Sequence, residues 1–159
     1  MMQSESARMS SAAEARFRVQ ASNSTPRAIK VIALDAAGET VVRRLADIAW
    51  RHATFFTATS PDDALRDLTG AHRSTDDEVD TADLVVLIAG PGGRAHAAAL
   101  IGEACSARRV TTTGCVVAAC AAPDRELSKT LAQLRPWSLM VVIANNDEYL
   151  DDLMTALRA

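Results

Sequence analysis

The chain has 159 residues, of which 48% are hydrophobic, and this is enough apolar material for one globular domain with a sizeable core. Its formal net charge of −3 gives a nucleic acid no overall attraction, so nucleic-acid binding is not expected. No apolar run approaches the roughly 20 residues needed to span a bilayer, and no apolar stretch of a signal peptide opens the chain. We therefore expect a cytoplasmic protein without membrane contact.

The N-terminal stretch differs in composition from the rest of the chain. Residues 1–27 are mainly Ser, Ala, Arg, Gln and Asn, with few large apolar side chains. Such a segment buries too little apolar surface to offset the conformational entropy lost on ordering. We expect a disordered tail over residues 1–27 and a single α/β domain over residues 28–159.

The domain opens with alternating strand and helix signals. Residues 29–34 form an apolar run rich in β-branched side chains, which is typical of a buried strand. Residues 39–51 place apolar side chains at helical spacing, and residues 54–58 indicate a second strand. The Ser-Pro-Asp-Asp sequence at residues 60–63 combines an N-cap, a first-turn proline and two acids. It predicts a helix over residues 61–68.

The middle of the chain carries an acidic segment and the most hydrophobic run. Residues 71–82 are polar and acidic without an apolar period, so they are expected to form an exposed loop. Their acids could bind a metal ion, but a solvated charge run is the commoner outcome. Residues 84–89 are apolar at every position, which suits a central parallel strand covered on both faces. This strand leads into the Gly-Pro-Gly-Gly sequence of residues 90–93.

The C-terminal part repeats the alternation. A helix is expected over residues 94–107, a strand over 110–119, a helix from about 124 to 134, a strand over 139–143, and a last helix capped at residues 145–147. Five strands that alternate with helices predict a three-layer, doubly wound, mostly parallel five-stranded sheet of the Rossmann-like kind. Ligands of such sheets bind at the carboxyl ends of the strands.

Three segments, taken in order, resemble the family of the bacterial cell-division protein FtsZ and tubulin. Residues 30–38 are similar to the first family strand, which runs into consecutive glycines. Residues 82–93 are similar to the strand that enters the glycine-rich tubulin signature loop, and residues 138–145 to the strand that ends in isoleucine-proline-asparagine. The resemblance covers residues 29 to about 153 and implies the FtsZ/tubulin N-terminal fold with a GTP site. A strand followed by glycines and a helix also occurs in many other dinucleotide-binding sheets.

The chain departs from this family where phosphates are bound. The family's glycine-rich phosphate loop is reduced here to its leading glycines, and the first loop holds Asp35 and Glu39 where the family brings phosphates. The acidic loop that completes a neighbour's hydrolytic site in the family has no counterpart. The resemblance therefore implies a domain that neither hydrolyses GTP efficiently nor polymerises by the family's longitudinal contact, and no catalytic residue is assigned.

Seven residues remain as candidates for a residual nucleotide site. Gly90, Gly92 and Gly93 could hold an anion with Arg94 as its charge partner, although a tight turn would need the same glycines. The resemblance adds three positions, namely Gly38 in the first loop, Glu126 near the ribose and Asn145 near the base. Glu126 is one position away from the family spacing, and Asn145 could simply cap a helix. His96 is expected to be a surface residue.

The sequence leaves the function open between several classes. Cys105, Cys115 and Cys120 follow no paired spacing, so they are expected to be reduced and to fill space as small buried side chains. The first hypothesis is a non-catalytic FtsZ/tubulin-like module that binds another protein or itself, with at most weak binding of GTP or another nucleotide. The alternatives are a small nucleotide- or dinucleotide-binding enzyme that uses the loop of residues 90–93, and a subunit whose partner completes an active site.

Overall fold

The structure is a computed structural model that describes residues 27–159. Five parallel strands make most of its sheet: β1 (Ile29–Ala33), β2 (Ala53–Thr57), β4 (Leu84–Ala89), β5 (Thr111–Val116) and β6 (Met140–Ile143). A two-residue strand, β3 (Arg66–Asp67), pairs antiparallel with β2 and gives the order β3-β2-β1-β4-β5-β6. The predicted doubly wound α/β sheet is therefore confirmed, with six strands instead of five.

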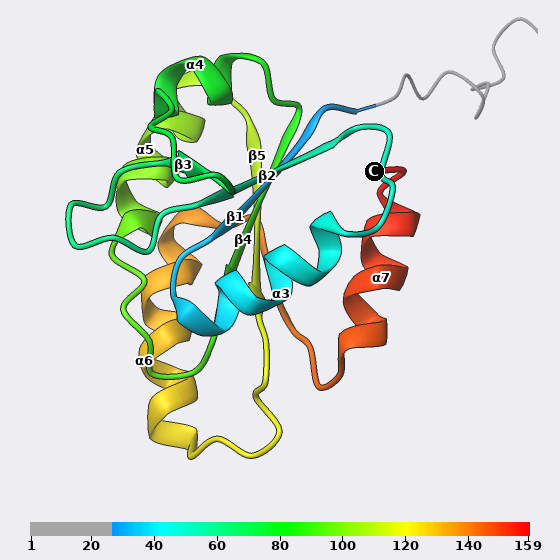
Figure 1. Cartoon of the computed structure of the whole chain (residues 1–159). Coiled ribbons are helices and arrows are strands. Elements are labelled where there is room, and N and C mark those ends of the chain that lie inside the picture. The colour runs from blue at the N-terminus through cyan, green and yellow to red at the C-terminus, as the bar shows by residue number, and fades with distance from the viewer. Residues whose placement is uncertain (1–26) are drawn as a thin grey trace, which may run out of the picture.

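Helices cover both faces of this sheet and complete a three-layer, Rossmann-like fold (Figure 1). One face carries α3 (Ala36–Ala46) and α7 (Asp147–Ala156), and the other carries α4 (Thr75–Asp80), α5 (Ala97–Arg108) and α6 (Asp124–Leu134). A short 3-10 helix, η2 (Arg135–Trp137), joins α6 to β6. The predicted tail over residues 1–27 lies outside the described residues, apart from Arg27.

The core consists of one apolar layer on each side of the sheet. All six residues of β4 are buried, and they alternate between the two layers, as expected for a strand covered on both faces. Leu87 packs with the residues of α5 and α6, whereas Val86 and Ile88 pack with those of α3 and α7. Because β4 is central and fully buried, the loop that follows it is held at a fixed point of the fold.

The helix predicted over residues 61–68 is wrong. Residues 60–63 form a single turn that ends with Asp63 in the left-handed region, at φ 53°. The chain then extends, and Arg66 and Asp67 pair with the edge of β2, while Leu65 is buried in the core. Pairing with β2 and burial of Leu65 thus outweigh the local helix-start signals, which are a weak preference over such a short segment.

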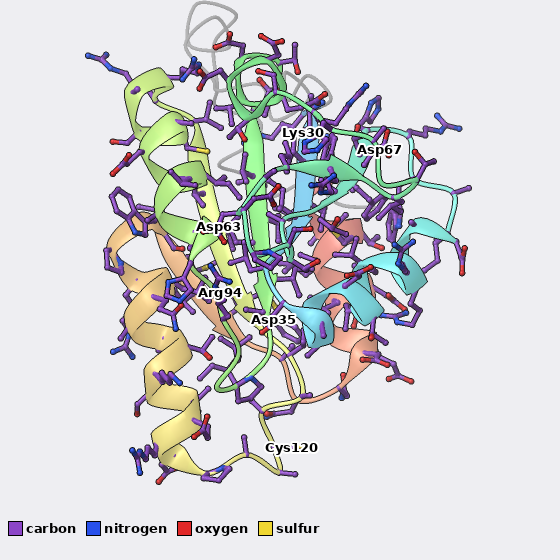
Figure 2. The ribbon with its side chains drawn as sticks, turned by 60° about the vertical axis from the view of Figure 1, so that its left-hand side comes forward. Lys30, Asp35, Asp63, Asp67, Arg94 and Cys120 are labelled. Atoms are coloured by element: carbon purple, nitrogen blue, oxygen red, sulfur yellow. The ribbon has the colours of Figure 1, made fainter. Side chains whose placement is uncertain are left out.

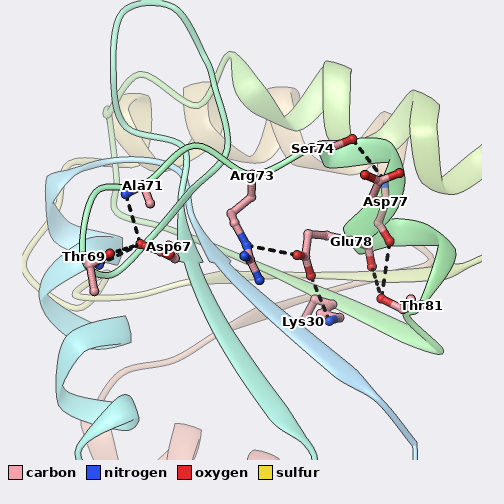
Figure 3. Close-up of polar contacts among 9 residues, drawn as sticks. All are labelled: Lys30, Asp67, Thr69, Ala71, Arg73, Ser74, Asp77, Glu78 and Thr81. Atoms are coloured by element: carbon pink, nitrogen blue, oxygen red, sulfur yellow. Dashed lines mark hydrogen bonds and ion pairs between the residues drawn. The ribbon is translucent and has the colours of Figure 1, made fainter.

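The exposed loop predicted over residues 71–82 is also wrong in part, because α4 forms there. Ser74 caps this helix, and the acids of its first turn lie at its positive end, where they stabilise it. Val79 is buried, and Glu78 binds Lys30 of β1 at 3.0 Å and Arg73 at 3.2 Å (Figure 3). The acidic run is therefore exposed as predicted, but it forms a helix tied to the sheet through Glu78 and not a loop.

The three cysteines are free, but only two of them match the prediction. Cys105 and Cys115 are buried, and burial raises the pKa of Cys115 to about 12. Cys120 is exposed, in the segment between β5 and α6 (Figure 2), so the expectation of a buried thiol is wrong there. β5 ends at Val116 and not at the predicted Ala119, so the exposed Cys120 lies further from the sheet than expected.

Candidate functional site

The sheet order defines where a ligand of this fold would bind. β1 and β4 are neighbours, and the chain continues from β1 to β2 on one side and from β4 to β5 on the other. In open α/β sheets, the crevice at the carboxyl ends of two such strands is the usual ligand site. Here this crevice is formed by residues 34–38 after β1 and residues 90–96 after β4.

The Asp35 carboxylate fills this crevice. It caps α3, and its Oδ1 accepts the N–H of Gly38 at 2.8 Å. The N–H of Gly90 donates to both carboxylate oxygens, at 3.1 and 2.9 Å. A Cβ atom on Gly93 would overlap the same carboxylate. Asp35 as a whole is 9% exposed. The N–H groups of a helix start and a glycine loop, which commonly bind an external anion, therefore bind an anion of the protein itself.

The environment of Asp35 opposes a second negative charge. Burial raises the pKa of its carboxyl group, and the hydrogen bonds from Gly38, Gly90 and Ala37 only partly counteract this effect. A phosphate placed in the same crevice would add Coulomb repulsion to a carboxylate that is already poorly solvated.

The glycine loop is bound to α6 through its backbone. Gly92, at φ 72°, donates its N–H to the carbonyl oxygen of Glu126 at 3.0 Å and to Thr130 Oγ1 at 2.9 Å. The Thr130 hydroxyl donates in turn to the carbonyl oxygen of Gly90 at 2.9 Å. Just beyond the loop, the N–H of Ala95 donates to Gln133 Oε1 at 3.0 Å. The N–H groups of Gly90, Gly92 and Ala95 thus all have acceptors within the protein.

Glu126 lies against the glycine loop. A Cβ atom on Gly92 would overlap its carboxylate, which could move aside, so the positive φ of 72° is the stronger reason for a glycine here. Glu126 places a second carboxylate beside the crevice. The predicted candidates Gly38, Gly90, Gly92, Gly93 and Glu126 are therefore brought together.

Arg94 follows the glycine loop, and Figure 2 labels it together with Asp63 and Asp35. Its Nη2 donates to the carbonyl oxygen of Pro61 at 3.1 Å and lies 3.8 Å from Asp63. Glu39, expected to face a phosphate, binds Arg43 at 2.9 Å and accepts from Thr59 at 3.2 Å. Of the two first-loop carboxylates, Asp35 therefore lies at the crevice, and the charge of Glu39 is compensated by an arginine.

Asn145 lies at a cavity of about 350 Å³ between α3 and the segments that follow β5 and β6. The cavity is lined by Ala37, Thr40, Val41, Arg44, Val117, Ala118, Ala144, Asn145, Asn146 and Asp147. Ala37 connects the two places, because a Cβ atom on Gly90 would overlap its methyl group. Asn146, not Asn145, caps α7. His96 is exposed and makes no side-chain capping bond, as expected for a surface residue.

Sequence reasoning missed the two α6 residues that bind the loop, Thr130 and Gln133. A signal for Thr130 exists, since it lies on the same helix face as Leu127, Leu131 and Leu134, and a polar residue in such a stripe needs a buried partner. Thr130 is fully buried. Gln133 is less conspicuous because a partly exposed glutamine in the last turn of a helix is common.

Replacing Thr130 with Val should destabilise the fold while keeping its shape. The change leaves the Gly90 carbonyl oxygen without its donor and removes one acceptor of the Gly92 N–H, so we expect a loss of about 1–2 kcal/mol in unfolding free energy. Urea unfolding measures this loss. Thr155→Val is the matched control, because its exposed hydroxyl binds only the carbonyl oxygen of Asp151 in its own helix. Equal losses in both variants would contradict the bridging role of Thr130.

No protein-family model matches this chain, and no curated protein is significantly similar to it. Within residues 27–159, no group of three or more His, Cys, Asp or Glu side chains is placed to hold a metal ion. Over the same part of the chain, none of the helices has the length and apolar character needed to cross a membrane.

Proposed function

We propose that this chain is a non-catalytic FtsZ/tubulin-like domain that acts in the cytoplasm as a protein-interaction or regulatory module and binds nucleotides at most weakly. The supporting observation is the Asp35 carboxylate, which accepts the N–H groups of Gly38 and Gly90 in the crevice between β1 and β4. The glycine loop follows a central strand, as the FtsZ/tubulin resemblance expects, but many other Rossmann-like folds share this feature.

The cost of binding a nucleotide follows from these contacts. A phosphate at residues 90–93 must displace Asp35 or Thr130 from the loop N–H groups, and each lost hydrogen bond costs about 1 kcal/mol. It would also face the carboxylates of Asp35 and Glu126, whose repulsion amounts to about 4 kcal/mol per charge pair at 4 Å and an effective dielectric constant near 20. The remaining contacts of a triphosphate must exceed this sum before binding is measurable.

A small nucleotide- or dinucleotide-binding enzyme is the second candidate. The 350 Å³ cavity at Asn145 favours it, because ligand pockets commonly start near 300 Å³ and this cavity touches the crevice through Ala37. In this case the base would enter the cavity and the phosphates would replace the Asp35 carboxylate at the loop of residues 90–93. This hypothesis requires Asp35 to move.

Titration calorimetry with GTP, ATP and NAD, together with a phosphate-release assay, distinguishes the two candidates. We expect no binding of micromolar affinity and no GTP turnover above a heat-killed control. Arg94→Ala should behave as the wild type does, because Arg94 binds Pro61 and Asp63. Micromolar affinity that weakens by roughly tenfold or more in Arg94→Ala would reject the proposal and support the enzyme, since a charge-assisted contact contributes about 1.5–3 kcal/mol.

A further inference from the structure

The two edges of the sheet differ in how they are protected. At one edge, β3 is only two residues long and consists of an arginine and an aspartate, and Arg66 binds Asp62 at 3.0 Å. At the other edge, β6 has no charged residue, and its exposed fractions are 49% for Met140 and 43% for Ile143. Leu139, which precedes it, is 83% exposed. Short charged edges resist pairing with another chain, whereas an uncharged apolar edge does not.

The backbone of β6 also has hydrogen-bonding groups that face away from the sheet. Ala144, just after β6, donates its N–H to Val116 of β5 at 2.8 Å. Backbone groups alternate in direction along a strand, so the N–H and C=O groups of Val142 and Met140 also face β5. Leu139, just before β6, also donates its N–H to β5, at 2.8 Å from the carbonyl oxygen of Thr112. Within residues 27–159, the backbone groups that point outward at this edge are therefore those of Val141 and Ile143, and a further strand could bind them.

We propose that β6 pairs antiparallel with β6 of a second copy of this chain, about a two-fold axis at Val141. A two-fold axis perpendicular to the sheet pairs residues whose side chains point to the same face of the joined sheet. Because side chains alternate between the faces along a strand, the numbers of two paired residues must differ by an even number. Pairing centred on Val141 sets Val141 opposite Val141, Met140 opposite Val142, and Leu139 opposite Ile143. Each pair is apolar, and the outward backbone groups of the two Val141 residues meet.

Several features favour a second copy as the occupant of this edge. Residues 138–146 contain no charge, so antiparallel self-pairing brings no like charges together along the strand. The helix that follows β6, α7, carries four acids, and Arg44 binds two of them, Asp147 at 3.8 Å and Asp151 at 3.0 Å. This inference rests on the proposed function in one respect, namely that the domain acts by binding a protein. It adds that this protein is a second copy of the same chain.

Analytical ultracentrifugation of the full chain tests the pairing. We expect a concentration-dependent dimer for the wild type and a dissociation constant raised roughly a hundredfold in Ile143→Lys, because one substitution enters a two-fold interface twice. The matched control is Leu100→Lys, which replaces an apolar side chain that is 53% exposed on α5 instead of on the edge strand. It should dimerise as the wild type does, and thermal unfolding checks that both variants are folded.

Disulfide trapping tests the register. In a Cys120→Ser background, Val141→Cys should form a disulfide-linked dimer, because hydrogen-bonded antiparallel pairs have Cα atoms about 5.5 Å apart, within disulfide range. Leu100→Cys in the same background should not form one. A wild-type monomer at every concentration, an unchanged dimer in Ile143→Lys, or trapping through Leu100→Cys alone would overturn the inference. The nucleotide titrations are independent of this outcome, so the two proposals fail separately.

Discussion

A Gly38→Ala variant is expected to lose about 2–3 kcal/mol of unfolding free energy, although alanine is the better helix former. The added Cβ would overlap the carbonyl oxygen of Ile88 in β4, which is a buried backbone atom of the central strand and has no room to move. The gain in helix propensity, about 1 kcal/mol, is smaller than the cost of pushing α3 away from the sheet. Urea unfolding of the purified variant gives the loss directly.

Gly114→Ala provides the comparison for this measurement. Its added Cβ would lie 3.0 Å from Ser138 Oγ and 3.4 Å from the Leu134 side chain, and these groups can shift slightly. We expect a loss below about 1 kcal/mol, partly offset by the smaller conformational freedom of the unfolded chain. If Gly38→Ala cost no more than Gly114→Ala, the close approach of α3 to β4 would be wrong, and Gly38 would be free to serve a ligand.

Asp35→Ala should destabilise the fold by about 2 kcal/mol. The variant loses the α3 cap, which contributes about 1 kcal/mol, and leaves the Gly90 N–H without its acceptor, at a cost of about 1–3 kcal/mol. Removing a buried charge returns part of this loss, because burial already disfavours the ionised carboxyl. Asn146→Ala, which removes only the exposed cap of α7, should cost about 1 kcal/mol. Equal losses would mean that Asp35 acts as a helix cap alone.

Much of the fold could be predicted from apolar patterns. The run at residues 84–89 matches β4 at both ends, and the run at residues 29–34 contains β1, because strands covered on both faces must be apolar throughout. The helix signals at residues 124–134 also match α6. Errors concentrate where the local signal is short: the edge strand β3 depends on pairing with β2, and α4 depends on contacts of Glu78 with Lys30 and Arg73.

The site could be predicted only in outline. A strand followed by glycines locates the loop of residues 90–93, and the carboxylate at Asp35 was expected near it. The sequence could not show that the Asp35 side chain turns inward to bind Gly90, since residues 55 positions apart meet only through the pairing of β1 with β4. For the same reason the bond between Gly92 and Thr130, and the contact of Arg94 with Pro61, had no visible signal.

The central claim is that the Asp35 carboxylate occupies the anion site of this fold, and phosphate-dependent thermal unfolding tests it most directly. Inorganic phosphate should raise the Tm of Asp35→Ala more than that of the wild type. The extra rise should be roughly 4 °C for each tenfold increase of the phosphate concentration above the dissociation constant of phosphate from the variant. Asn146→Ala, compared at equal ionic strength, measures the general stabilising effect of phosphate on any protein. The account predicts that the wild type responds no more than Asn146→Ala does. A wild-type response equal to that of Asp35→Ala would contradict it.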